Sequence, residues 1–373
     1  MKKKIGLIIN PIAGLGGKSG FKGTDNIEIK NQALKMGYSS ESISKTRYVF
    51  ENILSLFNKF EIITCPGEMG EEAIKNLDIN YKLFEQTFKK NTTSKDTKKA
   101  VKELLKENID LLIFAGGDGT AKDIYEIVKD EILCIGIPTG VKIQSAVYAK
   151  SPKLASEIIS RFILNKTYST ELREVMDIDE EEYRNERIKS KLYGYLKILF
   201  DKKYVQNIKA GSISSKEDQK LIAHEIINLL DQNIIYIVGG GSTTKQIFNE
   251  LKLEKTLIGV DLIQNKKILL KDVNEKQILE KIKNNKAKII VTIIGNQGYI
   301  FGRGNQQISA KVIRKIGKEN IYIVATKKKI LNLKGEPLLV DSGDPELDKE
   351  LSGYVKVITG QGERLVCKVG VEE

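Results

Sequence analysis

The sequence predicts an α/β protein of two domains, the first a doubly wound parallel sheet and the second rich in strands. Strand and helix patterns alternate over residues 1–155, which is typical of a parallel sheet with helices on both faces. Over residues 156–373, short apolar runs broken by Gly, Asn and Asp predominate. A chain of 373 residues is also long enough to bury two sizeable cores.

Each element of the first domain is predicted from an apolar run or from helical spacing. Strands are expected at 5–9, 61–64, 109–115 and 133–137. Helices are expected at 47–58, from residue 70 onward, at 94–108 and at 121–130. Because ligands of parallel sheets bind beyond the carboxyl ends of the strands, Asn10 and Asp118 should face one crevice.

The second domain is predicted from shorter and less regular runs. One helix is expected at 221–230. Strands are expected at 193–198, 234–238, 257–260, 289–294, 299–301, 321–325, 338–340, 354–358 and 365–369.

The strand at 109–115 runs into Gly116-Gly117-Asp118-Gly119-Thr120, a turn that also begins a helix. Glycines allow a ligand to approach the backbone, and a helix N-terminus offers free N–H groups, so this turn suits a phosphate. A carboxylate beside a phosphate is repelled unless it binds a metal or accepts a proton. Asp118 is therefore a candidate for chemistry, and the alternative is an ordinary turn with an N-capping aspartate.

This turn and a second motif resemble one superfamily. Asn10-Pro11-Ile12-Ala13-Gly14 matches the NPxAG opening of the ATP–NAD kinase, diacylglycerol kinase and sphingosine kinase superfamily, and residues 116–120 match its GGDGT motif. Further matching blocks lie at 67–70, 136–142, 173–177 and 302–307. The chain looks most similar to the ATP–NAD kinase-like branch, which includes the acetoin-catabolism X-type proteins.

The resemblance implies a phosphotransferase that uses ATP or polyphosphate to phosphorylate NAD to NADP, or a related hydroxyl acceptor, with Mg²⁺ as the cation. It implies that Asp118 is the base toward the ribose 2′-hydroxyl or else contributes to a Mg²⁺ site, and it identifies no further metal ligand. The residues expected at the nucleotide are Asn10, Gly14, Gly116, Gly117, Gly119, Thr120, Gly240, Gly241, Ser242, Thr243, Arg303 and Asn305. In the resembled families the C-terminal tail often packs back on the first domain.

Two departures from the resembled families leave the acceptor open. Neither the Asn-Glu pair of NAD kinases nor the Gly-Thr-Gly-Asn segment of lipid kinases occurs where it is expected, and residues 140–145 read Gly-Val-Lys-Ile-Gln-Ser. Lys142 is a candidate phosphate ligand in their place. The alternatives are a kinase of another small-molecule or lipid hydroxyl, and a nucleotide-binding regulatory protein without catalysis.

Three further segments are open to two interpretations each. Residues 236–244 form a strand, a glycine turn and a helix start, which indicates either a nucleotide contact or a plain helix cap. Residues 303–307 are rich in donors and are either a substrate contact or a turn before a helix capped by Ser309. The loop at 14–23 lacks the first glycine of a Walker A motif, so Lys18 and Lys22 either hold phosphates or are simply solvated.

Composition narrows the class of protein. The net charge is +12, but lysines are interleaved with acidic residues, which favours an anionic nucleotide over a nucleic acid. Three cysteines and one histidine, His224, argue against a disulfide framework, zinc chemistry and triads. We expect a cytoplasmic protein with neither a nucleic-acid nor a membrane partner, whose partners are small-molecule nucleotides and further copies of itself.

Overall fold

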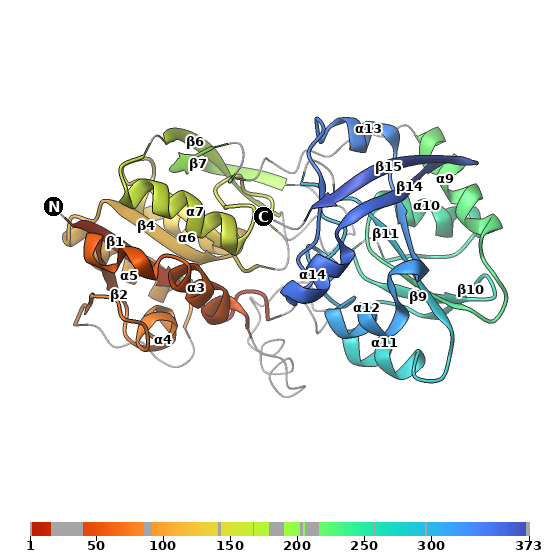
Figure 1. Cartoon of the computed structure of the whole chain (residues 1–373), viewed down its shortest axis with the longest axis horizontal. Helices are drawn as coiled ribbons and strands as arrows, with labels where there is room; N and C mark the ends of the chain where they lie inside the picture. Colours follow the sequence, from red (N-terminus) through yellow and green to blue (C-terminus); the bar gives the residue numbers. More distant parts are fainter. Residues whose placement is uncertain are drawn as a thin grey trace. The chain divides into compact units, whose positions relative to one another are not determined.

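The computed structural model describes residues 2–15, 40–85, 92–140, 143–166, 168–178, 190–201, 204–205, 216–256, 258–294 and 297–370. These fall into two compact units, one ending at residue 205 and one beginning at residue 216 (Figure 1). Each unit contains a mixed sheet flanked by helices, so the predicted α/β class is confirmed. Within the described helices, none is long and apolar enough to cross a membrane.

The first sheet has the order β3-β2-β1-β4-β5-β7-β6. Its strands are β1 (Lys3–Ile9), β2 (Phe60–Thr64), β3 (Tyr81–Leu83), β4 (Leu111–Gly116), β5 (Cys134–Pro138), β6 (Ser169–Ile178) and β7 (Ser190–Phe200). Neighbouring strands run parallel except β6 and β7, which are antiparallel. The boundary predicted at residue 155 is therefore wrong, because β6 and β7 extend the first sheet beyond it.

Helices α3 (Ser42–Glu51), α5 (Ser94–Lys106), α6 (Asp118–Val128) and α7 (Pro152–Ile163) cover this sheet, and α4 (Glu71–Ile74) is a single turn. The helix predicted at 47–58 lies earlier in the chain than expected, since α3 begins at Ser42 and ends at Glu51, and a 3-10 turn, η1 (Leu54–Lys59), follows. The crossovers β1→β2 and β4→β5 step in opposite directions along the sheet. Because such crossovers are right-handed, α3 and α6 cover opposite faces and a switch point lies between β1 and β4.

The second sheet has the order β10-β9-β8-β11-β12-β14-β15-β13. Its strands are β8 (Ile235–Val238), β9 (Asp261–Gln264), β10 (Lys267–Leu270), β11 (Ala287–Thr292), β12 (Ile321–Val324), β13 (Leu338–Leu339), β14 (Gly353–Gly360) and β15 (Glu363–Gly370). The helices are α9 (Lys216–Asn228), α10 (Ser242–Glu250), α11 (Glu275–Lys281), α12 (Ala310–Ile316), α13 (Lys327–Leu331) and α14 (Pro345–Leu351). The C-terminal tail thus completes the sheet of the second unit (Figure 1).

Two strands predicted in this unit are wrong. The strand predicted at 257–260 begins only at Asp261, because the preceding segment turns around the buried ammonium of Lys255, which donates to the carbonyl of Gly259 over 3.2 Å. The run at 299–301 contributes a single bridging pair between Tyr299 and Leu339.

Candidate functional site

Asn10 joins the first two predicted motifs at the switch point. Its backbone N–H donates to the carbonyl of Ala115 over 2.9 Å, as a continuation of the β1–β4 ladder. Its side-chain Nδ2 donates to Oγ1 of Thr120 over 2.9 Å, and its Oδ1 accepts from the N–H of Ile12 over 3.2 Å. The structure therefore brings Asn10 into direct contact with the 116–120 turn through Thr120.

A third loop, after β5, packs against both motifs. The amides of Thr139 and Gly140 each donate to the carbonyl of Gly116 over 3.0 Å. Gly14 has φ +79°, and a Cβ there would lie 2.2 Å from the carbonyl oxygen of Thr139. A Cβ on Gly140 would lie 2.6 Å from Cα of Gly117, so these glycines allow the loops to meet.

The glycines of the 116–120 turn differ in their surroundings. A Cβ on Gly116 would lie 2.3 Å from Oγ1 of Thr120, and one on Gly117 would lie 3.2 Å from Cα of Gly140. Gly119 is exposed, and a Cβ there would have no neighbour within 4 Å. Close packing therefore explains Gly116 and Gly117, whereas only Gly119 opens onto space that a ligand can approach.

Asp118 is the first residue of α6, and its side chain is turned into the protein, with 5% of the residue exposed. Its Oδ2 accepts from the amide of Gln144 over 2.7 Å and its Oδ1 from the amide of Ser145 over 2.9 Å. Burial raises the pKa of Asp118 to about 7; hydrogen bonds from Ser145 and Gln144 oppose that rise, and the charge of Asp177 adds to it. A carboxyl group with this pKa is suited to accept a proton at neutral pH.

The loop that binds Asp118 is fastened to β6. The hydroxyl of Ser145 donates to the carbonyl of Met176 over 2.8 Å and accepts from the N–H of the same residue over 2.9 Å. The amide of Ala146 donates to the carbonyl of Glu174 over 2.9 Å. These backbone donors were not predicted from the sequence. The nearest matching blocks are residues 136–142, which precede the donors in the chain, and residues 173–177, which lie on the strand that holds them.

Lys122 is the nearest described cation along α6. It lies one turn beyond Asp118, with its Nζ 4.3 Å from the ring centroid of Tyr193 on β7. Burial lowers the pKa of Lys122, but Tyr193, Asp177 and Glu126 outweigh that effect, so the pKa is raised overall. Lys122 is therefore a charged group beside the carboxylates of this site. Lys18, Lys22 and Lys142 lie outside the described residues.

The predicted second glycine turn joins β8 to α10. A Cβ on Gly240 would lie 2.6 Å from the carbonyl oxygen of Ile258. Gly241 has φ +133°, and a Cβ there would lie 2.6 Å from Cγ2 of Thr292. Both glycines are thus required by the local packing and backbone conformation, whether or not a nucleotide binds.

The two predicted hydroxyl groups of this turn point in different directions. Thr243 is buried, and its Oγ1 accepts from Nζ of Lys329 over 3.0 Å. Lys329, on α13, also donates to Oγ1 of Thr292 over 3.2 Å and to the carbonyl of Ile293 over 3.3 Å. Ser242 is exposed at the start of α10. The sequence carries no signal for the buried role of Lys329, because it stands in a run of three lysines.

Arg303 and Asn305 are both buried and shape the loop before α12. Oδ1 of Asn305 accepts from the N–H of Gly302 over 3.1 Å, and its Nδ2 donates to the carbonyl of Ile300 over 2.9 Å. The guanidinium of Arg303 lies 4.6 Å from the ring centroid of Tyr299. These contacts fit a turn before α12 and leave a substrate contact untested. The predicted cap is wrong, because Ser309 stands at the N-cap position but its hydroxyl donates to Glu275 and makes no cap hydrogen bond.

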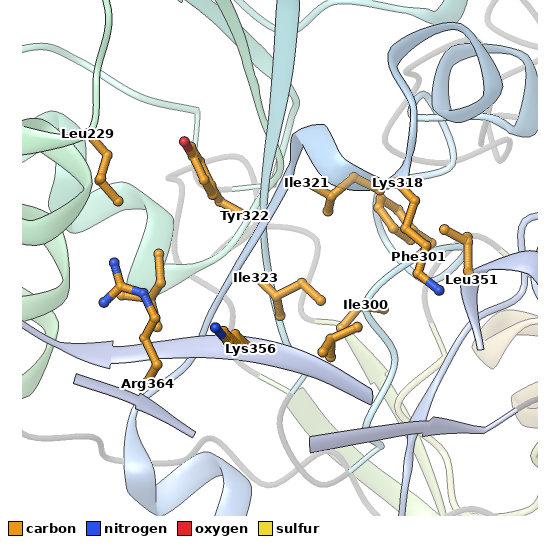
Figure 2. Close-up of a pocket in the computed structure, with 12 residues that line it drawn as sticks. Leu229, Ile300, Phe301, Lys318, Ile321, Tyr322, Ile323, Leu351, Lys356 and Arg364 are labelled. Atoms are coloured by element: carbon orange, nitrogen blue, oxygen red, sulfur yellow. The ribbon is translucent and has the colours of Figure 1, made fainter. Parts of the chain in front are cut away.

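The second unit also contains a cavity of about 380 Å³ lined in part by residues of β12 and β14. Figure 2 shows its apolar walls, with Ile300 and Ile323 between Arg364 on one side and Lys318 on the other. None of the predicted site residues lines it. This cavity is therefore not part of the candidate site, which consists of the residues at the switch point of the first unit.

The fold and this geometry define a two-domain α/β protein whose glycine-rich turn and buried carboxyl group lie at a sheet switch point. Two family models match the chain, the ATP-NAD kinase N-terminal domain over residues 5–168 and the ATP-NAD kinase C-terminal domain over residues 231–369. The chain belongs to the ATP-NAD kinase family, whose domains indicate a kinase.

Comparisons with individual proteins are weaker. No curated protein matches the chain. Among solved structures, diacylglycerol kinases from Bacillus anthracis str. Sterne, two of them assigned provisionally, match with 16%, 14% and 16% identity and TM-scores of 0.26, 0.26 and 0.25. Each match covers 48% of this chain and 44–46% of the other. At these identities and TM-scores, the similarity says nothing about which acceptor this chain uses.

Proposed function

We propose that the protein transfers the γ-phosphoryl group of ATP to the 2′-hydroxyl of NAD, forming NADP. The observation that carries this proposal is the buried carboxyl group of Asp118, held by two backbone amides at the switch point. Family membership supports a kinase, and NAD is the acceptor named by the matching family models.

In the proposed step, the acceptor oxygen forms a bond to the γ-phosphorus while the bond from that phosphorus to the β–γ bridging oxygen breaks. The hydroxyl proton passes to the carboxylate of Asp118, and ADP leaves with the bridging oxygen. The first-turn amides of α6 have no intrahelical acceptor and are suited to phosphate oxygens, and exposed Gly119 leaves space for them.

Mg²⁺ would neutralise phosphate charge when it binds with ATP. The described residues contain no group of three or more His, Cys, Asp or Glu side chains that could hold a metal ion. Both carboxylate oxygens of Asp118 already accept amide hydrogen bonds. We therefore propose that the ion arrives with the phosphates of ATP, and we assign it no preformed protein site.

The test is turnover with purified full-length protein, Mg²⁺, NAD and either ATP or polyphosphate. We expect NADP, measured with an NADP-specific dehydrogenase, from at least one donor. Asp118→Asn is the matched control, because it keeps the size of the side chain and removes the base. If neither donor gives NADP while another hydroxyl compound stimulates ATP hydrolysis, NAD is not the acceptor.

A further inference from the structure

We infer that Ser145 is a positioning residue, through which β6 fixes the carboxyl group of Asp118 for proton transfer. Asp118 is a base only under the proposed function, so this role of Ser145 rests on that function. The arrangement of the two residues is nevertheless a property of the folded chain, and it can be measured without turnover.

Ser145 contacts both partners at once. Its amide donates to Oδ1 of Asp118 over 2.9 Å, and its hydroxyl bridges the N–H and the carbonyl of Met176, at 2.9 and 2.8 Å. Ser145 is fully buried, so water cannot replace the hydroxyl without rearrangement. One residue therefore links the carboxyl group on α6 to the backbone of β6.

This link matters because the segment carrying the amides is irregular. Residues 143–145 belong to neither a helix nor a strand, so no ladder or helical turn holds their N–H groups in place. The bridge to Met176 and the bond from the amide of Ala146 to the carbonyl of Glu174 attach this segment to a regular strand. Loss of the hydroxyl removes the first attachment and leaves the second.

The electrostatic consequence has a definite sign. Burial has the largest effect on the pKa of Asp118 and, with the neighbouring carboxylate of Asp177 on β6, disfavours the charged form, whereas hydrogen bonds from the side chain and the amide of Ser145 and from the amide of Gln144 stabilise it. The other charged or titratable groups described here are Lys122, on α6 beside Asp177, and Tyr193, on β7 beside Lys122. If Ser145 loses its hydroxyl, its side-chain hydrogen bond to Asp118 is lost, the amide donors are held less firmly, and the carboxyl group of Asp118 should bind its proton more tightly.

The test compares Ser145→Ala with Ser156→Ala in the full-length protein. Ser156 is a matched control, because it is also a buried serine of the first unit, with its hydroxyl donating to the carbonyl of Lys153 over 2.6 Å. We expect Ser145→Ala to lower kcat at pH 7 by about twofold to fivefold and to move the acidic limb of the kcat/KM profile up by about half to one pH unit. Ser156→Ala should change neither.

A second readout does not require activity. The carboxyl carbon of Asp118, labelled with ¹³C and assigned by its absence in Asp118→Asn, should titrate at higher pH in Ser145→Ala than in the wild type. Ser145→Cys keeps a weak donor and should lie between the two. An unchanged titration midpoint would overturn the inference, as would a faster kcat in Ser145→Ala, which would mean that the loop restrains the base. Absence of NADP formation by the wild type would instead sink the proposed function and leave this titration decisive for Ser145.

Discussion

Gly116 and Gly119 stand three residues apart in one turn, and alanine at each should have opposite effects on stability. A Cβ on Gly116 would lie 2.3–2.7 Å from three side-chain atoms of Thr120, whose Oγ1 accepts from Asn10. A Cβ on Gly119 would meet nothing within 4 Å, and Gly119 stands in a helix at a negative φ. Gly116→Ala therefore tests the packing of the turn, and Gly119→Ala tests its accessibility to a ligand.

The magnitudes follow from these surroundings. Overpacking a buried site costs about 1–3 kcal/mol, and a lost hydrogen bond between Asn10 and Thr120 adds about 1 kcal/mol. For a unit of this size, Gly116→Ala should then lower Tm by roughly 4–16 °C. Gly119→Ala restricts the unfolded chain without a clash, so it should raise stability by about 0.4–1 kcal/mol, or Tm by roughly 1–4 °C.

The assay pairs thermal unfolding with equilibrium binding of ATP. If phosphate approaches the backbone at Gly119, the added methyl group should weaken ATP binding by about tenfold or more while Tm rises. Stronger or unchanged ATP binding in a stable Gly119→Ala protein would refute a phosphate site at this turn. A stable Gly116→Ala protein would refute the packing argument for that glycine.

Three further outcomes are expected. Asp118→Asn should keep ATP affinity within a few-fold and lower turnover by about two to four decades, and near-normal turnover would remove Asp118 from the mechanism. Burial raises the folded-state pKa of Asp118 from 3.8 to about 7, so its contribution to stability is full below pH 3.8 and is lost as the pH rises to 7. The Tm of the wild type should therefore fall more between pH 5 and pH 8 than that of Asp118→Asn, and equal slopes would contradict this. Lys255→Met leaves the fully buried Asp261 without the cation that contacts it at 3.2 Å and should cost about 3–5 kcal/mol in urea unfolding. Lys271→Met, which removes the exposed pair with Glu254, should cost less than about 1 kcal/mol, and similar losses in the two variants would argue against a buried charge.

The sheet of the first unit could be predicted because its central strands are continuous apolar runs. In β1, β4 and β5 most side chains are fully buried, so hydrophobicity alone marks these strands. β6 could not be found in this way, since it is an edge strand with exposed Leu172 and several charged residues. With β6 missed and the predicted strand at 193–198 assigned to the second domain, the boundary fell at residue 155, inside α7, although Ser151 and Pro152 form a regular start for that helix.

The candidate site was predictable where side chains carry the signal. Asp118 could be recognised as a carboxyl group at the end of a strand and the start of a helix, and the structure places it there. The donors that hold Asp118 could not, because a backbone amide has no sequence signature and its position depends on the path of the loop. The roles of Gly116 and Gly240 were also hidden, since a glycine required by packing and one required by a ligand look alike in sequence.

The loop after β5 supplies the donors that hold Asp118. The amides of Gln144 and Ser145 meet the carboxyl group of Asp118 directly. Backbone donors cannot be removed by side-chain substitution, so under the proposed function the strength of Asp118 as a base depends on how firmly the loop is held. The bridge from Ser145 to Met176 is therefore the point at which a single side-chain change can alter the proton affinity of Asp118 while its own side chain stays intact.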